Sequence, residues 1–198
     1  DYPICLNIGG IANVSYEYEG KRIAYDICIA NQMLNYLANK LGYDYDNNGS
    51  FARQGKVNLD LLKAFNNNSY YDKEAPKSLG REFFEKYQHQ IIEESSLDVR
   101  DILATATEHI ASQIVKSTDM LEKSKMLITG GGAKNNYLVE RISELSKHEV
   151  VIPDTMIIDY KEALIFAFLG TLKMEGKINV LSSVTGATSD SSSGTIHN

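Results

Sequence analysis

The sequence lacks three features that would each point to a class of protein: an excess of positive charge, a long apolar run and a leader segment. Its formal net charge is −6, which argues against a general electrostatic affinity for nucleic acid or anionic lipid. No apolar run is long enough to span a bilayer. The chain begins at Asp1 without a basic and then apolar leader, so we expect a cytoplasmic chain that has been cut from a longer protein.

Cysteines and metal-binding patterns are also scarce. Cys5 and Cys28 are the only cysteines, and both fall in strand-like runs with a third such run between them. Strands two apart in a sheet lie about 9–10 Å from each other, which is too far for a disulfide. We therefore expect two buried, free thiols in a reducing compartment. The four histidines have no ligand-like spacing, so we predict no metal site among the side chains.

The chain does contain regular apolar segments. With 43% hydrophobic and 23% charged residues, its composition is that of an ordinary globular protein. The pattern predicts strands at 4–8, 11–18 and 22–26, followed by a helix at 31–41. This β-β-β-α opening is typical of the ribonuclease-H-like fold that actin-like and sugar-kinase ATPases use.

The rest of the chain divides into a polar middle and a regular second half. Between about 43 and 97 we expect a helical insertion, with short helices at 57–66 and 80–93. The second half predicts a long amphipathic helix at 98–119, a strand at 125–129, a helix at 134–147, a strand at 149–152 and a helix at 160–175. Residues 182–193 are expected to be loop. The β-α-β-α order indicates a parallel region, so we predict one α/β domain over 1–198, a mixed sheet with helices on both faces.

Two glycine-rich turns, each directly after a short apolar strand, are the most informative motifs. The first contains Gly9 and Gly10, and the second contains Gly130, Gly131 and Gly132. Glycine permits positive φ and a close approach of a ligand to the backbone, and free N–H groups in such turns can bind an anion. The two turns indicate a chain that holds a nucleotide at more than one point. The structural alternatives are a hairpin turn and a tight strand-to-helix turn.

Several segments, in order along nearly the whole chain, resemble the C-terminal half of the anhydro-N-acetylmuramic acid kinases. They are Leu6 to Val14, Asp46 to Gly49 with Gln54 to Val57, Lys77 to Phe84, Gly130 to Asn135, Lys161 to Ala167 and Ser183 to Ala187. Any one segment is weak by itself, but six in order are hard to obtain by chance.

The resemblance implies a two-lobed actin-like kinase with ATP and sugar in the cleft between the lobes. Such enzymes use ATP to convert 1,6-anhydro-N-acetylmuramic acid to N-acetylmuramic acid 6-phosphate during peptidoglycan recycling. ATP and Mg²⁺ are the expected cofactors, the ion being held mainly by phosphates and water. The catalytic base and the first phosphate loop would lie on an N-terminal lobe outside this chain. This C-terminal lobe would then be inactive alone, with the missing lobe as its partner and a homodimer as a candidate assembly.

By the same resemblance, nucleotide contacts are expected from Asn7, Gly9, Gly10, Asn13, Gly130, Gly131, Gly132 and Asn135. Sugar contacts are expected from Asp26, Asn31 and Glu162. Asp26 and Asn31 bound the segment Asp-Ile-Cys-Ile-Ala-Asn, where the family usually has Asp-Thr-Gly-Pro-Gly-Asn. The glycines that would admit a ligand to the backbone at that turn are therefore lost here.

Some of these residues have an equally simple structural interpretation. The spacing of Asp159 and Glu162 is that of a capping box, in which the glutamate bonds the backbone at the start of a helix. Asn13 could orient a phosphate or a water, or pair with nearby backbone. Arg81 could bind a carboxylate or phosphate ligand, or form a structural salt bridge. Lys134 is interpreted as a solvated charge.

Three other functions were weighed against the kinase. Residues 44–49 imitate the start of a calcium-binding loop, but Gly55 stands where a bidentate glutamate is required, so calcium binding is rejected and a surface loop is expected. A nuclease is set aside because Asn7 occupies the place of an acidic metal ligand. A non-catalytic, chaperone-like ATP-binding module of the actin fold is the alternative function, favoured by the altered turn after Asp26.

Overall fold

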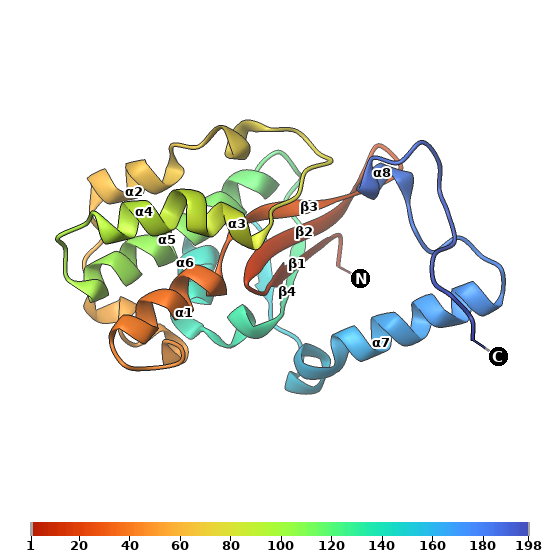
Figure 1. Cartoon of the computed structure of the whole chain (residues 1–198). Helices are drawn as coiled ribbons and strands as arrows, with labels where there is room; N and C mark the ends of the chain where they lie inside the picture. The colour runs from red at the N-terminus through yellow and green to blue at the C-terminus, as the bar shows by residue number, and fades with distance from the viewer. Residues whose placement is uncertain (1, 198) are drawn as a thin grey trace.

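The two halves of the chain meet in one mixed sheet (Figure 1). The computed structural model describes residues 2–197. Strands β1 (Ile4–Ile8), β2 (Ile11–Tyr18) and β3 (Lys21–Ile29) form an antiparallel meander, and β4 (Lys125–Thr129) and β5 (Glu149–Val151) extend it in parallel with β1. The strand order is β3-β2-β1-β4-β5, so the predicted α/β architecture with a mixed sheet is confirmed.

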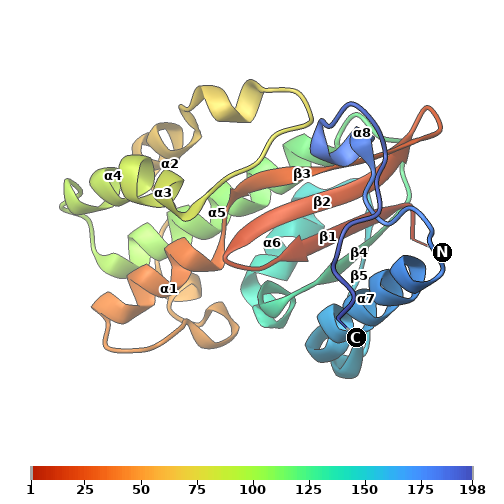
Figure 2. The same ribbon diagram turned by 45° about the vertical axis from the view of Figure 1, so that its right-hand side comes forward.

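Helices α1 (Asn31–Lys40), α5 (Val99–Thr118) and α6 (Asn136–Leu145) lie together on one side of the sheet, whereas α7 (Thr155–Met174) and the short α8 (Ser182–Thr185) lie on the other (Figures 1 and 2). The insertion between α1 and α5 contains α2 (Leu59–Asn66), α3 (Arg81–Phe83) and α4 (His89–Glu93). In the part of the chain that the structure describes, no helix is both long and apolar enough to cross a membrane.

The alternation of side chains along β1 explains why one face of the sheet forms the core. Ile4, Leu6 and Ile8 are buried, whereas Cys5 is exposed and Asn7 half-buried, as expected when successive side chains point to opposite faces. The prediction that Cys5 is buried was therefore wrong. Cys28 is buried, and both thiols are free.

Four predicted elements differ from the observed ones. β3 continues to Ile29, because the residues after Asp26 are apolar and buried and none of them is a glycine that would end the strand. The expected helix at 80–93 is interrupted by a wider turn at Phe84–Gln88. α7 begins at Thr155, where the Asp154 side chain accepts the Met156 N–H. The tail at 182–193 contains α8 in addition to loop.

A buried polar network ties the insertion to α5. The imidazole of His109 lies 3.2 Å from the Tyr71 hydroxyl through Nε2 and 2.7 Å from Asn66 Oδ1 through Nδ1. Gln113 donates to the same Asn66 oxygen. Because His109 is fully buried, desolvation lowers the pKa of its imidazole from 6.5 to about 3, so the ring is neutral in the folded protein at neutral pH.

This network predicts a loss of stability in mild acid. Above pH 6.5 the His109 ring is neutral in both states, but between about pH 6.5 and 3 only the unfolded chain takes up the proton. The free energy of unfolding should therefore fall by up to about 1.4 kcal/mol for each pH unit in that window. Urea unfolding at pH 7.5, 6 and 5 measures the slope.

His109→Gln should reduce that slope, whereas His197→Gln, at an exposed position, should leave it unchanged. An identical pH slope in His109→Gln and the unmodified chain would contradict the assignment of a neutral, buried imidazole.

Candidate functional site

Parallel pairing of β1 with β4 brings both glycine-rich turns to one edge of the sheet. Asn7 lies directly opposite Thr129, so the two strands end side by side. The start of α1 lies at the same edge, because the Asn31 N–H donates to the Gly9 carbonyl at 3.1 Å and the Ala30 N–H donates to the Gly10 carbonyl at 2.8 Å. The carboxyl ends of parallel strands are where open α/β sheets bind ligands.

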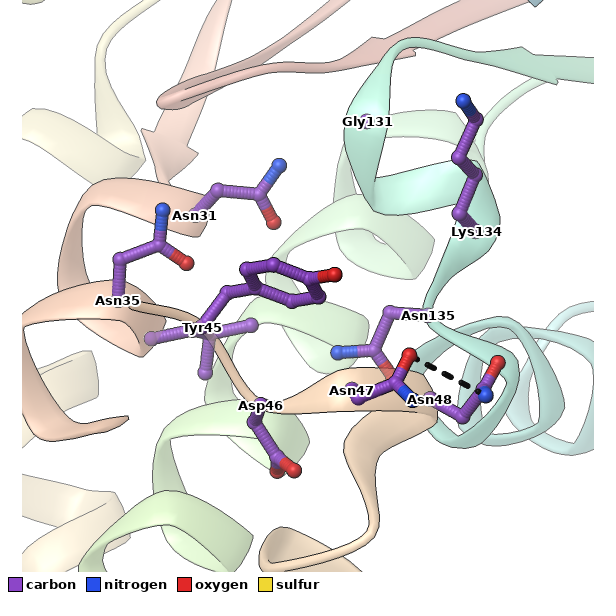
Figure 3. A pocket seen from close by; sticks show the side chains of 10 residues that line it. Asn31, Asn35, Tyr45, Asp46, Asn47, Asn48, Gly131, Lys134 and Asn135 are labelled. Carbon is purple, nitrogen blue, oxygen red and sulfur yellow. Dashed lines mark hydrogen bonds between the residues drawn. The ribbon is translucent and has the colours of Figure 1, made fainter. Parts of the chain in front are cut away.

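A cavity of about 320 Å³ opens beside this edge, between the start of α1, the turn after β4 and the insertion. It is lined by Asn31, Leu34, Asn35, Tyr45, Asp46, Asn47, Asn48, Gly131, Lys134 and Asn135. Five of these ten residues are asparagines, so most of the polar lining is uncharged and offers both donors and acceptors. The aromatic ring of Tyr45 extends among the amides (Figure 3).

The hydrogen bonds of two asparagines fix which end of each amide faces the cavity. The Asn31 Nδ2 donates to the Ile8 carbonyl at 3.2 Å, which leaves its oxygen directed toward Tyr45 (Figure 3). The Asn135 oxygen caps α6 by accepting the Leu138 N–H at 3.1 Å, so its nitrogen faces the cavity from the other side. The cavity thus offers an acceptor and a donor from two sides of Tyr45, a pattern that suits the polar edge of a heteroaromatic base or the hydroxyls of a ribose.

The opposite wall is the loop at 45–49, which is fixed by hydrogen bonds to residues that directly follow it. The Asp46 carboxylate accepts the backbone N–H groups of Phe51 and Ala52, both at 2.9 Å, and points away from Tyr45 (Figure 3). Gly49 has a φ of +69°, and a Cβ there would lie 2.5 Å from the Asn135 Oδ1. The segment that the sequence presented only as a surface loop therefore forms a wall of the cavity.

Of the three glycines after β4, two are required by backbone conformation or packing and one is not. Gly130 has a φ of +81°, which side chains other than glycine rarely tolerate. A Cβ on Gly132 would lie 2.3 Å from the Ile8 Cγ2, so close packing against β1 excludes a side chain there. At Gly131 the nearest atom to such a Cβ would be the Asn31 Nδ2, at an ordinary 3.6 Å. No contact within the described residues requires glycine at position 131, and Gly131 lines the cavity.

The first glycine turn resembles Gly131 in this respect. Neither Gly9 nor Gly10 has a positive φ, and a Cβ on either would meet its neighbours at 3.5 Å or more. Of the two properties that glycine offers, this turn therefore does not use positive φ. The absence of an internal requirement at either position leaves open space next to the backbone, which is where a ligand can approach.

A polar row crosses the second face of the sheet at the same level. Thr129 pairs with Asn7, Asn7 pairs with Asn13, and Asn13 pairs with Asp26. Directly paired residues share a face, so four polar side chains from four strands stand in line. Three of the residues predicted from the sequence, Asn7, Asn13 and Asp26, are therefore brought together by strand register.

Asp26 is anchored by its own chain. Its Oδ2 accepts the Leu79 N–H at 2.9 Å. Ile27 has no partner across the ladder, because Ala12 pairs with Cys28 and Asn13 with Asp26, so a bulge keeps Asp26 on the polar face. Asp26 does not line the cavity that contains Asn31, although the sequence assigned both to the sugar.

Helix α7 contributes a lysine that the sequence did not single out. Lys161 Nζ donates to Asn7 Oδ1 and, at 2.8 Å, to Thr129 Oγ1. Two residues earlier, Asp159 pairs with Lys134 of the cavity at 2.5 Å. Both contacts follow from the helix starting at Thr155, which puts 159 and 161 in its interior. The capping-box interpretation of Asp159 and Glu162 is therefore wrong. Lys134 is an exposed charge, as interpreted, and in addition forms this surface ion pair.

Two other predicted residues lie apart from the cavity lining. Glu162 is exposed on α7, and Arg81 forms an exposed ion pair with Glu85 at 3.2 Å. Within residues 2–197, no group of three or more His, Cys, Asp or Glu side chains is arranged to hold a metal. A divalent ion would have to arrive with ligands of its own, such as phosphate oxygens and water.

Sequence reasoning missed several residues of this site: Asn35, Tyr45, Asn47, Asn48 and Lys161. The asparagines after Tyr45 lie in a segment that resembles the family, but the only site considered for them was a calcium loop. The position of Lys161 depends on where α7 begins and how it crosses the sheet, which no local pattern reveals.

Solved structures share this fold. An activator of 2-hydroxyisocaproyl-CoA dehydratase from Clostridium difficile, with bound ADPNP, is similar with a TM-score of 0.53 and 17% identity, covering 92% of this chain and 65% of that one. Component A of (R)-2-hydroxyglutaryl-CoA dehydratase from Acidaminococcus fermentans is similar with a TM-score of 0.54 and 18% identity, covering 83% and 59%. At such identities the likeness concerns the fold alone, an α/β architecture with a mixed sheet.

Curated sequences give a closer relationship. The anhydro-N-acetylmuramic acid kinases of Sulfurimonas denitrificans and Vibrio cholerae are each 34% identical, over 97% and 98% of this chain. The chain spans about half of their length, 55% in both cases. The family model described as "Anhydro-N-acetylmuramic acid kinase" matches residues 1–198. The predicted resemblance is confirmed: the chain belongs to the anhydro-N-acetylmuramic acid kinase family.

Proposed function

We propose that this chain is the C-terminal, nucleotide-binding lobe of an ATP-dependent kinase of the cytoplasm that converts 1,6-anhydro-N-acetylmuramic acid to N-acetylmuramic acid 6-phosphate in peptidoglycan recycling. The observation that carries the proposal is the amide-lined cavity at the edge where both glycine turns meet. Gly131 lines it without an internal reason to be glycine. Family membership supplies the reaction, and the cavity supplies a place for ATP.

In this proposal the lobe positions the nucleotide rather than performing the chemistry. Base and ribose would occupy the cavity between Tyr45 and the amides of Asn31 and Asn135, with the phosphates toward Gly9 and Gly10. Phosphoryl transfer depends mainly on positioning and charge stabilisation. Mg²⁺ would accompany ATP on the phosphate oxygens. The base that activates the attacking water would belong to the other lobe, and the sugar would lie against the polar row that ends at Asp26.

The surface of α7 supports the need for that other lobe. The helix has twenty residues and none is buried, although Leu164, Phe166 and Phe168 are 63%, 71% and 61% exposed. A helix that exposes several large apolar side chains in succession is normally covered. Because the chain spans 55% of the length of its relatives, the remaining lobe of the same polypeptide is the partner we propose for α7, with a second copy of this chain as the competing occupant.

A non-catalytic ATP-binding module is the second candidate, and one observation favours it. The segment after Asp26 continues as strand, and Ile27 to Ala30 are buried. No loop is free to contact a sugar there. A module that only bound ATP would keep the cavity and would not need the polar row.

Substitutions at Gly131 and Gly132 should have different effects, one on ATP affinity and the other on the stability of the fold. Gly131→Ala should weaken ATP binding about tenfold or more, because its methyl group projects into the cavity without disturbing the lobe. Gly132→Ala should instead lower the free energy of unfolding by about 1–3 kcal/mol, because its methyl group collides with Ile8. Titration calorimetry and urea unfolding measure the two effects. Equal effects of both substitutions on ATP affinity would contradict the assignment of Gly131 to the nucleotide.

The proposal that this chain binds the nucleotide while the other lobe carries the base predicts which protein turns over. In a coupled kinase assay with anhydro-N-acetylmuramic acid and ATP, the full-length enzyme should turn over and this chain alone should not, because it lacks the base. A full-length enzyme that binds ATP without turnover would favour the module. Turnover by this chain alone would show that the base lies within it.

The assignment of α7 predicts a difference in hydrogen exchange. Amides of α7 should exchange quickly in the isolated chain and slowly in the full-length kinase, whereas those of the buried α5 should be slow in both. Protection of α7 that rises with the concentration of the isolated chain would identify a second copy as the occupant and contradict our choice.

A further inference from the structure

Lys161 is a partly buried cation held by neutral groups. Its ammonium donates to the side-chain oxygens of Asn7 and Thr129. Across the described residues, no carboxylate lies within ion-pair distance of it. Glu162, the neighbouring acid, is exposed on α7. An ammonium has three donors, and the two bonds to the sheet leave one of them directed elsewhere.

Partial burial of the Lys161 ammonium against uncharged partners is energetically unfavourable unless an anion binds to it. Removing a charged ammonium from water is unfavourable when its partners are uncharged. Burial accordingly lowers the pKa of Lys161, and the nearby Glu162 and Cys5 only partly oppose the change. A bound anion would offset the desolvation cost of the ammonium, which the chain's own neutral partners do not fully offset.

The position of the ammonium identifies the kind of anion. Its two acceptors lie close to the glycine turns in the sequence: Thr129 comes directly before Gly130, and Asn7 comes two residues before Gly9. α7 is joined to the cavity as well, through the ion pair of Asp159 with Lys134. The cation therefore stands where β1 and β4 end, beside the two glycine turns, and its helix is joined through Asp159 to one residue of the cavity lining.

We propose that Lys161 binds the terminal phosphates of the nucleotide whose base and ribose occupy the cavity. This inference rests on the proposed function, and it adds a cation from α7 to a site whose other polar groups are mainly neutral amides and backbone, since Lys134 is paired with Asp159 and the Asp46 carboxylate with backbone N–H groups. The sugar carries a carboxylate that is also anionic. The glycine turns favour phosphate, because several oxygens can then use the backbone N–H groups on either side of the lysine.

The test compares ligands that differ only in their phosphates. Dissociation constants for ATP, ADP and adenosine are measured by calorimetry with Mg²⁺ on the unmodified chain, Lys161→Gln, Lys161→Arg and the exposed control Lys123→Gln. We expect Lys161→Gln to weaken ATP about tenfold or more and to change adenosine less than twofold. Lys161→Arg should retain most of the ATP affinity, and Lys123→Gln should match the unmodified chain.

The outcomes separate this inference from the proposed function. If neither ATP nor adenosine binds the unmodified chain, the nucleotide site itself is wrong. If both bind but Lys161→Gln leaves ATP unchanged, or weakens ATP and adenosine equally, only the phosphate role of Lys161 is overturned. Anhydro-N-acetylmuramic acid is titrated into the same proteins, and a loss of affinity confined to this sugar would assign the lysine to the sugar carboxylate and would also overturn the inference.

If Lys161→Gln does not fold, the pKa of Lys161 can be measured in the unmodified chain instead. In the unmodified chain, NMR titration of the Lys161 Nζ should show its pKa rising on addition of ATP and not on addition of adenosine. A pKa that is the same with both ligands would contradict phosphate binding by this residue.

Discussion

The parallel pairing of β1 with β4 is the constraint on which the site depends. These strands are about 120 residues apart in the sequence, yet Ile4 lies opposite Met126 and Asn7 opposite Thr129. The pairing buries Leu6 and aligns the two strand ends. A slip of one residue would turn every side chain of a strand to the other face. Asn7 would then leave the polar row, and Ile8 would no longer lie beneath Gly132.

The same pairing gives the sheet two faces with different tasks. One face is apolar and packs against α1, α5 and α6, which supplies the hydrophobic free energy of folding. The other face carries the polar row and meets α7 (Figure 2). α7 is bound at its beginning through Asp159 and Lys161 and is exposed along the rest of its length. In the proposed function, a helix bound near its start at the end of β1 and β4 and exposed along its apolar remainder would link the position of the other lobe to the nucleotide.

Much of the fold could be predicted from local sequence, because the signals were strong and short-ranged. Alternating apolar residues marked β1 and β2, and the spacing of Ile102, Ile110 and Ile114 marked α5 almost to its ends. The start of α7 was placed five residues late, since Asp154 and Asp159 are both plausible caps and only the fold selects between them.

The site was predictable in part, and the reason lies in the range of the interactions. Glycine turns are local motifs, so the edge of the sheet could be located. The cavity needs the loop after Tyr45 to fold back onto α6, and the polar row needs strand register and a bulge at Ile27. Which glycines serve packing and which face a ligand depends on atoms of β1 that lie more than a hundred residues away.

The most direct test of the central claim is a crystal structure of the chain soaked or co-crystallised with a non-hydrolysable ATP analogue and Mg²⁺. The account predicts the base and ribose between Tyr45 and the amides of Asn31 and Asn135, with the phosphates extending past Gly131 toward Gly9 and Lys161. A nucleotide bound elsewhere on the lobe, with the amide-lined cavity empty, would contradict it.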